Sequence, residues 1–191
     1  MSLLSELLKR KDKLKRTETL VTCIDGRQYV ESGEDKRVVN VNCYGYVVDT
    51  KPDDIPVLIT DKVYIGSQDC AADEILLNFN IQHVLSLGVN VNVSVDNKFV
   101  DILDLPETNI CDFLNECLEY VREAVIGNEN ILIHCNAGVS RTATIAIAYL
   151  MQYHEMEYEE AFTLVKSRRA SIKPNLGFKN QLMKLKPGEI I

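Results

Sequence analysis

The sequence predicts an α/β fold, in which a central mixed or parallel sheet is flanked by helices. Two observations support this prediction: strand-like and helical segments alternate from about residue 57 onward, and one fully apolar run is followed at once by a turn and a helix. With 191 residues, of which 46% are hydrophobic, the chain is long enough to bury one substantial core. We therefore expect a single domain with an appendage.

The appendage should comprise residues 1–56. Leucines and a basic run at 9–16 predict an amphipathic helix or a charged arm within residues 2–16. Three interpretations of this basic segment stay open: a solvated helix face, a nuclear-import signal, and a docking element for an acidic partner. The rest of the appendage mixes short β-like runs with turn signals and indicates no chemistry.

Regular elements should fill residues 57–187, and residues 188–191 should form a tail. Strands are predicted, in chain order, at 63–65, 83–87, 99–103 and 131–133. Helices are predicted at 70–79, 110–125, 141–153, 157–168 and 175–185. The alternation of valine with polar residues at 89–95 predicts an edge strand or a hairpin.

Charge and composition argue against several classes of protein. A net charge of −7 does not suit a nucleic-acid binder, because neutralising a phosphate backbone requires a basic surface. The six cysteines lack short paired spacings, which is typical of reduced cytosolic thiols rather than of a disulfide framework or a zinc site. The start has no signal-peptide pattern, and no apolar run reaches membrane-spanning length. We expect a cytoplasmic protein without nucleic-acid or membrane partners, and the basic run leaves nuclear entry open.

The run from His134 to Thr142 contains the residues that predict chemistry. It lies between the apolar run at 131–133 and the predicted helix at 141–153, and such a turn directs several backbone N–H groups at one tetrahedral oxyanion. Gly138 lets the backbone curl closely around the anion. The Arg141 guanidinium is a planar fork that can hold two phosphoryl oxygens. The predicted phosphate-binding residues are Asn136, Ala137, Gly138, Val139, Ser140 and Arg141.

Cys135, at the base of this loop, is the predicted nucleophile. The N–H dipoles, Arg141 and the positive end of the helix all favour its thiolate form. His134 should orient the loop through hydrogen bonds, and the Thr142 hydroxyl can hydrogen-bond the sulfur when it leaves as a thiolate. No metal or other cofactor is expected, because Arg141 and the N–H groups already supply the positive potential that metal ions provide in other phosphatases.

Transfer of a phosphoryl group to Cys135 expels an alkoxide or phenoxide, so a carboxylic acid should protonate the leaving oxygen. The candidates upstream are Asp101, Asp104 and Glu107. Asp104 is favoured because it stands where the predicted strand at 99–103 ends, and catalytic groups gather in loops beyond strand ends. Asp101 is interpreted as a structural or surface carboxylate.

The loop from His134 to Thr142 resembles the signature loop of the protein tyrosine phosphatase superfamily. Further stretches resemble the dual-specificity phosphatases in matching order, and in particular the atypical subgroup that lacks the kinase-binding rhodanese-like domain. These stretches are Val63 to Gln68, His83 to Ser86, the Asp104 loop, and Ser171 to Phe178. The resemblance covers residues 57–187 as one catalytic domain and implies a protein tyrosine phosphatase-like fold.

The resemblance also implies roles for single residues. Cys135 corresponds to the nucleophile, Arg141 to the phosphate clamp and Asp104 to the general acid. Asn175 corresponds to a residue that hydrogen-bonds and braces the loop. Arg169 matches a position that in some relatives contacts a second substrate phosphate, while the alternative is a solvated arginine at a helix end.

The predicted function is hydrolysis of phosphotyrosine and phosphoserine or phosphothreonine through a phosphocysteine intermediate. The resemblance implies a role in stress-activated MAP kinase signalling, with a phosphorylated protein such as a MAP kinase or an upstream kinase as partner. Two alternatives stay open: a phosphoprotein-binding scaffold with little catalysis, and a phosphatase for a non-protein phosphate. Inositol lipids are disfavoured because the loop lacks the lysines that suit a multiply charged head group. The sequence does not set the oligomeric state.

Overall fold

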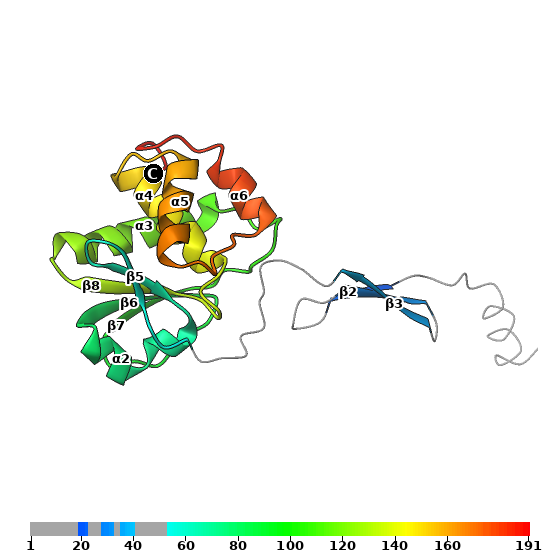
Figure 1. The fold of residues 1–191 in the computed structure, drawn as a ribbon, viewed down its shortest axis with the longest axis horizontal. Helices are drawn as coiled ribbons and strands as arrows, with labels where there is room; N and C mark the ends of the chain where they lie inside the picture. The colour runs from blue at the N-terminus through cyan, green and yellow to red at the C-terminus, as the bar shows by residue number, and fades with distance from the viewer. Residues whose placement is uncertain (1–18, 23–27, 33–34, 41–52) are drawn as a thin grey trace, which may run out of the picture. The chain divides into compact units, whose positions relative to one another are not determined.

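The computed structural model describes residues 19–22, 28–32, 35–40 and 53–191 (Figure 1). The chain divides into two compact units, residues 1–43 and 44–191. In the first unit, three strands pair in an antiparallel sheet in the order β1-β2-β3: β1 (Thr19–Thr22), β2 (Gln28–Ser32) and β3 (Asp35–Asn40). The helix or arm predicted at 2–16 lies outside the described residues, and the domain boundary after residue 56 stays a prediction.

The second unit is built on a five-stranded mixed sheet with the order β4-β5-β8-β6-β7. Its strands are β4 (Val57–Thr60), β5 (Val63–Gly66), β6 (Ile81–Leu87), β7 (Asp96–Val100) and β8 (Asn130–His134). Only β4 runs antiparallel to its neighbour. Because Gly66 of β5 and Ser86 of β6 both pair with His134 of β8, the carboxyl ends of the central strands meet at one edge. The α/β fold with a mixed sheet is confirmed.

Helices cover both faces of this sheet. They are η1 (Gln68–Ala71), α2 (Asp73–Asn78), α3 (Cys111–Ile126), α4 (Arg141–Tyr153), α5 (Tyr158–Arg168) and α6 (Leu176–Leu182). The helices α3 to α6 lie on one side of the sheet, and α2 lies on the other (Figure 1). Strand β8 serves both faces because its side chains alternate: Ile131 and Ile133 pack with α3 and α4, and Leu132 packs with α2.

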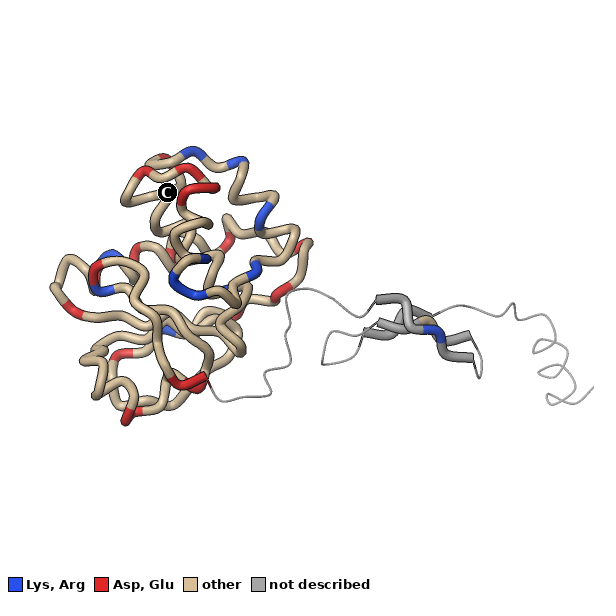
Figure 2. The backbone as a smooth tube through the Cα atoms, viewed as in Figure 1, with Lys and Arg blue, Asp and Glu red and all other residues tan. Residues whose placement is uncertain are grey.

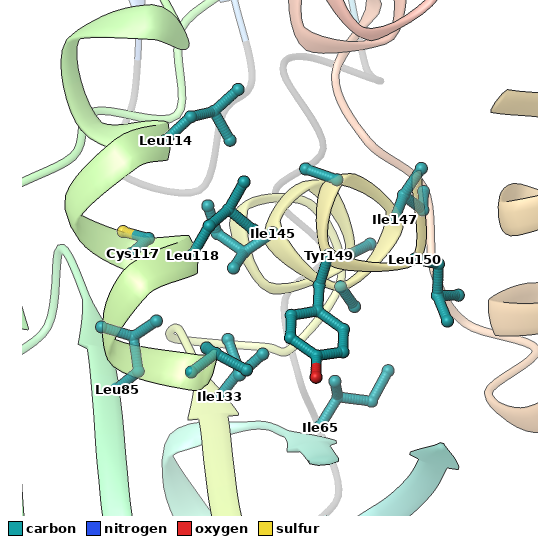
Figure 3. Close-up of a cluster of buried hydrophobic side chains, with 14 of the residues drawn as sticks. Ile65, Leu85, Leu114, Cys117, Leu118, Ile133, Ile145, Ile147, Tyr149 and Leu150 are labelled. Carbon is teal, nitrogen blue, oxygen red and sulfur yellow. The ribbon is translucent and has the colours of Figure 1, made fainter. Parts of the chain in front are cut away.

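Helix α4 lies at the centre of the larger core. Every residue from Thr142 to Met151 is buried, so this helix is enclosed on all sides rather than along one stripe. Figure 3 shows Ile145 of α4 and Leu118 of α3 pointing toward each other beside Ile133 of β8. Tight burial fixes α4 against β8, and the short loop between them is therefore held at both ends.

Several predicted elements differ from the structure. The helix expected at 70–79 is divided into η1 and α2, and the helix expected at 175–185 ends at Leu182. The strand expected at 99–103 is β7 at 96–100, and the chain from Asp101 to Ile110 is an irregular connection to α3. The ladder stops at Val100 because its partner strand β6 ends at Leu87, and beyond it the carbonyl of Ile102 accepts a hydrogen bond from Arg141. The edge strand or hairpin expected at 89–95 is wrong, because this segment forms no strand. Asn97 Nδ2 donates to Val91 O, and Val91, Val93 and Val95 pack against the α2 side of the sheet.

No helix within the described part of the chain is long and apolar enough to cross a membrane.

Candidate active site

In the loop between β8 and α4, the backbone carbonyl groups are hydrogen-bonded within the described part of the chain and the N–H groups are not. The carbonyl groups of the loop all accept hydrogen bonds from the surrounding structure, whereas none of the N–H groups from Asn136 to Arg141 donates one within the described residues. The carbonyl partners are Gln68 N for Asn136 (3.0 Å), Arg169 Nη2 for Ala137 (3.2 Å), Arg169 Nε for Gly138 (3.1 Å), Lys173 N for Val139 (2.8 Å) and Thr144 N for Ser140 (2.9 Å). With the carbonyls held outward, the N–H groups are left to bind an anion.

Arg169 is a positioning residue for this loop. It is only 7% exposed, its Nε and Nη2 donate to the carbonyls of Gly138 and Ala137, and it forms an ion pair with Asp53. The structure corrects the interpretation of Arg169 as a solvated arginine, because its guanidinium is buried. Contact of Arg169 with a second substrate phosphate stays a prediction.

Gly138 is required by the curl of the loop. Its φ is +63°, in the left-handed region that favours glycine. A Cβ atom at this position would lie 2.4 Å from the carbonyl oxygen of Gly66 in β5. The loop therefore packs directly against the backbone at the end of β5, a contact that the sequence did not predict.

The Arg141 guanidinium presents one edge to the pocket. Its Nη1 donates to Leu87 O (3.0 Å) and Ile102 O (3.2 Å), which fix the orientation of the fork. Its Nε is buried and has no hydrogen-bond partner within the described residues, and it lies 4.0 Å from Asp104 Oδ2. The Nε and Nη2 edge can accordingly hold two oxygens of a phosphoryl group.

Asp104 faces the loop from the connection between β7 and α3. Its Oδ1 accepts hydrogen bonds from Ser140 Oγ and Asn175 Nδ2, both at 2.7 Å. Burial raises the pKa of the Asp104 carboxyl above its usual range, although these hydrogen bonds and the nearby Arg141 oppose the shift. Asp101 and Glu107 are exposed, so among the three carboxylates considered Asp104 is the one that lines the pocket.

Asn175 joins the acid to the loop. Its Oδ1 accepts from Phe178 N (2.9 Å) and caps α6, while its own backbone N–H donates to Ser140 Oγ (3.0 Å). The hydroxyl of Ser140, expected only as part of the cradle, thus connects Asn175 and Asp104. This role was missed because hydrogen bonds between residues distant in sequence leave no local pattern.

The sequence analysis also did not predict a contact between α6 and the segment that follows Asp104. A Cβ atom at Gly177 would lie 1.9 Å from Pro106 O, so the first turn of α6 packs against the segment that follows Asp104. The available signal was a glycine inside a predicted helix, where it is otherwise unfavourable.

His134 and Thr142 lie beneath the pocket. His134 Nε2 is 2.8 Å from Ser86 Oγ, which in turn donates to Asn97 Oδ1 at 2.8 Å. The other ring nitrogen, Nδ1, lies 3.4 Å from Cys135 O, so both nitrogens of His134 face an oxygen atom. Burial lowers the pKa of His134 to about 4, which keeps the ring neutral. The Thr142 hydroxyl is buried and has no hydrogen-bond partner within the described residues.

These groups surround a single small pocket. It is lined by Asp104, Cys135, Asn136, Ala137, Val139, Ser140 and Arg141. Cys135 is 3% exposed at its base. The pocket thus combines a thiol nucleophile, an anion cradle and a carboxylic acid, which together suffice for transfer of a phosphoryl group through the cysteine. Among the described residues, no cluster of three or more histidine, cysteine or acidic side chains could hold a metal ion.

Comparison with known proteins agrees with this geometry. The family model described as "Dual specificity phosphatase, catalytic domain" matches residues 63–187. The chain belongs to the dual specificity phosphatases. The resemblance predicted from the loop and its neighbouring stretches is therefore confirmed, and the protein is a cysteine-dependent protein phosphatase.

Individual relatives show the extent of the similarity. "Dual specificity protein phosphatase 19" of Mus musculus is 37% identical over 191 residues, covering 94% of this chain and 87% of that one. "MAP kinase phosphatase with leucine-rich repeats protein 1" of Dictyostelium discoideum is 38% identical over 137 residues, covering 68% of this chain and 16% of that one. The crystal structure of the human tyrosine phosphatase-like serine/threonine/tyrosine-interacting protein is 29% identical, with a TM-score of 0.64, and the match covers 68% and 93% of the two chains.

Replacement of Gly138 by alanine should impair this dual specificity phosphatase. The new Cβ would meet the Gly66 carbonyl, and the positive φ would strain the backbone, so we expect a loss of about 1–3 kcal/mol in the free energy of unfolding. The displaced N–H groups should also lower kcat/KM by about 10-fold or more. Urea denaturation and hydrolysis of para-nitrophenyl phosphate measure the two effects.

Gly127→Ala is the matched control. Gly127 ends α3 with φ of −67°, and an added Cβ would approach no atom closer than 3.4 Å. Its stability and activity should stay near those of the wild-type phosphatase. Equal effects of the two substitutions would contradict the conformational requirement assigned to Gly138.

Replacement of His134 by glutamine should make the free energy of unfolding less dependent on pH on the acid side. In wild type the unfolded chain binds a proton below about pH 6.5, while folded His134 does so only near pH 4, so folding stability falls as pH drops through this window. The loss amounts to about 3 kcal/mol. Glutamine does not titrate, and its side-chain amide can still hydrogen-bond the Ser86 hydroxyl. Urea denaturation of both proteins between pH 7 and 4 measures the difference.

Comparing the two proteins is necessary because Asp104 acts in the opposite direction. Its raised pKa means that the folded state takes up that proton first as pH falls. This contribution is common to wild type and His134→Gln and cancels in their difference. Parallel stability curves would contradict the assignment of a neutral, buried His134.

Proposed function

We propose that the protein hydrolyses phosphotyrosine and phosphoserine or phosphothreonine in proteins through a phosphocysteine intermediate on Cys135. One observation carries the proposal. Within the described residues, the two buried side-chain polar atoms without a hydrogen-bond partner are Arg141 Nε and Thr142 Oγ1. Buried polar groups are normally paired, so unpaired ones require an explanation. Phosphoryl oxygens and the departing sulfur supply the missing partners.

In the first step, Cys135 Sγ attacks phosphorus as a thiolate and the bond from phosphorus to the substrate oxygen breaks. Asp104 gives its proton to that oxygen, which leaves as a neutral hydroxyl group. The N–H groups of the loop and the Arg141 fork hold the three equatorial oxygens. The raised pKa of Asp104 supports this role, because more of the carboxyl stays protonated as pH rises.

In the second step, a water molecule attacks phosphorus and the bond between sulfur and phosphorus breaks. The Asp104 carboxylate now accepts the proton of the water, so it returns to its initial state. The Thr142 hydroxyl stabilises Cys135 as it leaves as a thiolate. Inorganic phosphate is released, and the enzyme is restored.

The pocket lining supports dual specificity. Among the described residues, its lining comes from the loop and from Asp104, and none of it is aromatic. A deep pocket would reach only phosphotyrosine, whereas a pocket without an aromatic wall also admits the shorter side chains of phosphothreonine and phosphoserine.

We further propose a MAP kinase or an upstream kinase as substrate. The similarity to the Dictyostelium relative, which is named as a MAP kinase phosphatase, supports this assignment. We also place the reaction in the cytoplasm, with access to the nucleus. The described cysteines are consistent with a reducing compartment, since all four are free thiols: Cys70, Cys111, Cys117 and Cys135.

Hydrolysis by the full chain in the presence of a metal chelator tests the proposal. We expect release of phosphate from para-nitrophenyl phosphate and from both phosphotyrosine and phosphothreonine peptides. Rapid acid quenching with a radiolabelled phosphopeptide should leave phosphate bound to Cys135, identified by mass spectrometry. Activity on phosphotyrosine alone would overturn the dual specificity.

The scaffold alternative predicts a different result. It draws support from the human relative, which is named as an interacting protein. A protein that binds phosphopeptides without turnover or a labelled Cys135 would favour that alternative. The location of Cys135, Asp104 and Arg141 in one pocket favours catalysis.

A further inference from the structure

A groove lies beside the active-site pocket, lined by the end of β7, the connection to α3 and the first turns of α3. Two large apolar side chains on it remain accessible, since Leu103 is 63% exposed and Phe99 is 43% exposed. Apolar side chains of this size in a concave surface are a common basis for binding a peptide segment. The groove is outside the catalytic chemistry described above.

The charged side chains that line this groove are all acidic. They are Asp101, Asp112 and Glu116, and no lysine or arginine is among the lining residues. Glu116 lies 3.6 Å from Lys98 Nζ, and Asp112 accepts a hydrogen bond from Asn109. Asp101 makes no hydrogen bond or ion pair with the rest of the described chain. Red segments mark this connection between β7 and α3 in Figure 2. The groove therefore suits a cationic, partly apolar ligand.

The groove and the pocket share a wall. Leu103 lines the groove and Asp104, the next residue, lines the pocket. The carbonyl of Ile102, between Asp101 and Leu103, is bonded to Arg141 at 3.2 Å, which ties this wall to the phosphate-binding fork. A chain whose phosphorylated residue enters the pocket would continue over the groove.

We propose that this groove binds a basic, partly apolar segment of the phosphorylated protein, next to the phosphorylated residue. This assignment rests on the proposed function and adds the substrate class. Asp101 and Asp104 are three residues apart, so their Cα atoms lie at most about 11 Å from each other. An extended peptide covers that length in about three residues. The favoured arginine or lysine therefore stands about two to four positions from the phosphorylated residue.

Steady-state kinetics of the full chain with matched phosphotyrosine peptides test this inference. The peptides differ only in one residue, arginine or glutamate, placed about two to four positions before or after the phosphotyrosine. We expect kcat/KM to favour arginine by about fivefold at one or more of these positions, the size of one exposed ion pair. The preference should shrink as salt is added, because exposed charges are screened.

Asp101→Asn should reduce the arginine preference to about twofold or less. Asp61→Asn is the matched control, because Asp61 is an exposed carboxylate in the turn before β5, at the opposite edge of the sheet. That variant should keep the full preference. Each preference is the ratio of kcat/KM for the arginine peptide to kcat/KM for the glutamate peptide, measured with one protein. A change in the overall activity of a variant therefore does not affect it.

The outcomes separate the two proposals. A wild type that hydrolyses para-nitrophenyl phosphate but shows no preference, or prefers glutamate, overturns the groove assignment and leaves the proposed function intact. A preference that persists in Asp101→Asn also overturns it. A preference that emerges only after the basic run at 9–16 is neutralised would assign the groove to the chain's own segment and overturn the substrate assignment. A wild type without any hydrolysis overturns the proposed function, and the substrate class with it.

Discussion

Cys135→Ser should lower kcat for every phosphorylated substrate by about 10⁴-fold or more. Serine has nearly the same shape, but its hydroxyl does not ionise at neutral pH and cannot attack phosphorus in a cradle that provides no separate base for it. The loop carbonyls and Arg141 keep their bonds in this variant, so the anion site should survive. Phosphopeptide affinity, measured by calorimetry, should therefore stay within about threefold of wild type.

Cys111→Ser is the control for this substitution. Cys111 is a free, exposed thiol at the start of α3, so its loss should leave both turnover and affinity unchanged. If Cys135→Ser kept more than about a tenth of the wild-type rate, the phosphocysteine intermediate would be excluded.

Asp104→Asn should slow hydrolysis to an extent that depends on the leaving group. The amide keeps an oxygen to accept from Ser140 and Asn175 but has no acidic proton to give. A threonine alkoxide is far more basic than a tyrosine phenoxide and needs that proton more. We expect a loss of about 10³-fold for phosphothreonine, about 10²-fold for phosphotyrosine and less for para-nitrophenyl phosphate.

The pH profile gives an independent measure of the same group. Wild-type kcat should fall as pH rises through the raised pKa of Asp104, because the acid is then deprotonated. This alkaline limb should be absent in Asp104→Asn. Glu107→Gln, an exposed carboxylate of the same connection, should retain it. An equal loss for all three substrates would argue against protonation of the leaving oxygen by Asp104.

Local patterns predicted the strand, loop and helix around Cys135 well. Helix α4 was predicted at 141–153 and has these bounds. The prediction succeeded because the signals for a buried apolar helix after a glycine-containing turn come from residues adjacent in the sequence. Strand β7 is displaced by three residues from its prediction, because it ends at Val100, opposite the last residue of its partner strand β6. Such a contact depends on the tertiary fold and leaves no trace in periodicity.

Arg169 shows the same limit at the site. Its partners Gly138 and Asp53 are 31 and 116 residues away in sequence, and only the folded chain brings them together. Resemblance to relatives predicted a contact with a second phosphate, whereas the bonds of Arg169 to the loop carbonyls were not predicted. By contrast, the bracing role of Asn175 was predicted by resemblance, and the structure adds that the brace extends through Ser140 to Asp104.

The attachment of the Asp104 segment to α6 has a consequence for turnover. Two hydrogen bonds hold the carboxyl, and Pro106 lies against Gly177, so the acid is in position before any substrate arrives. The entropy cost of ordering this segment is met once, during folding, rather than in every catalytic cycle. No lid has to close over the phosphate, and the rate of the chemical step should be independent of solvent viscosity.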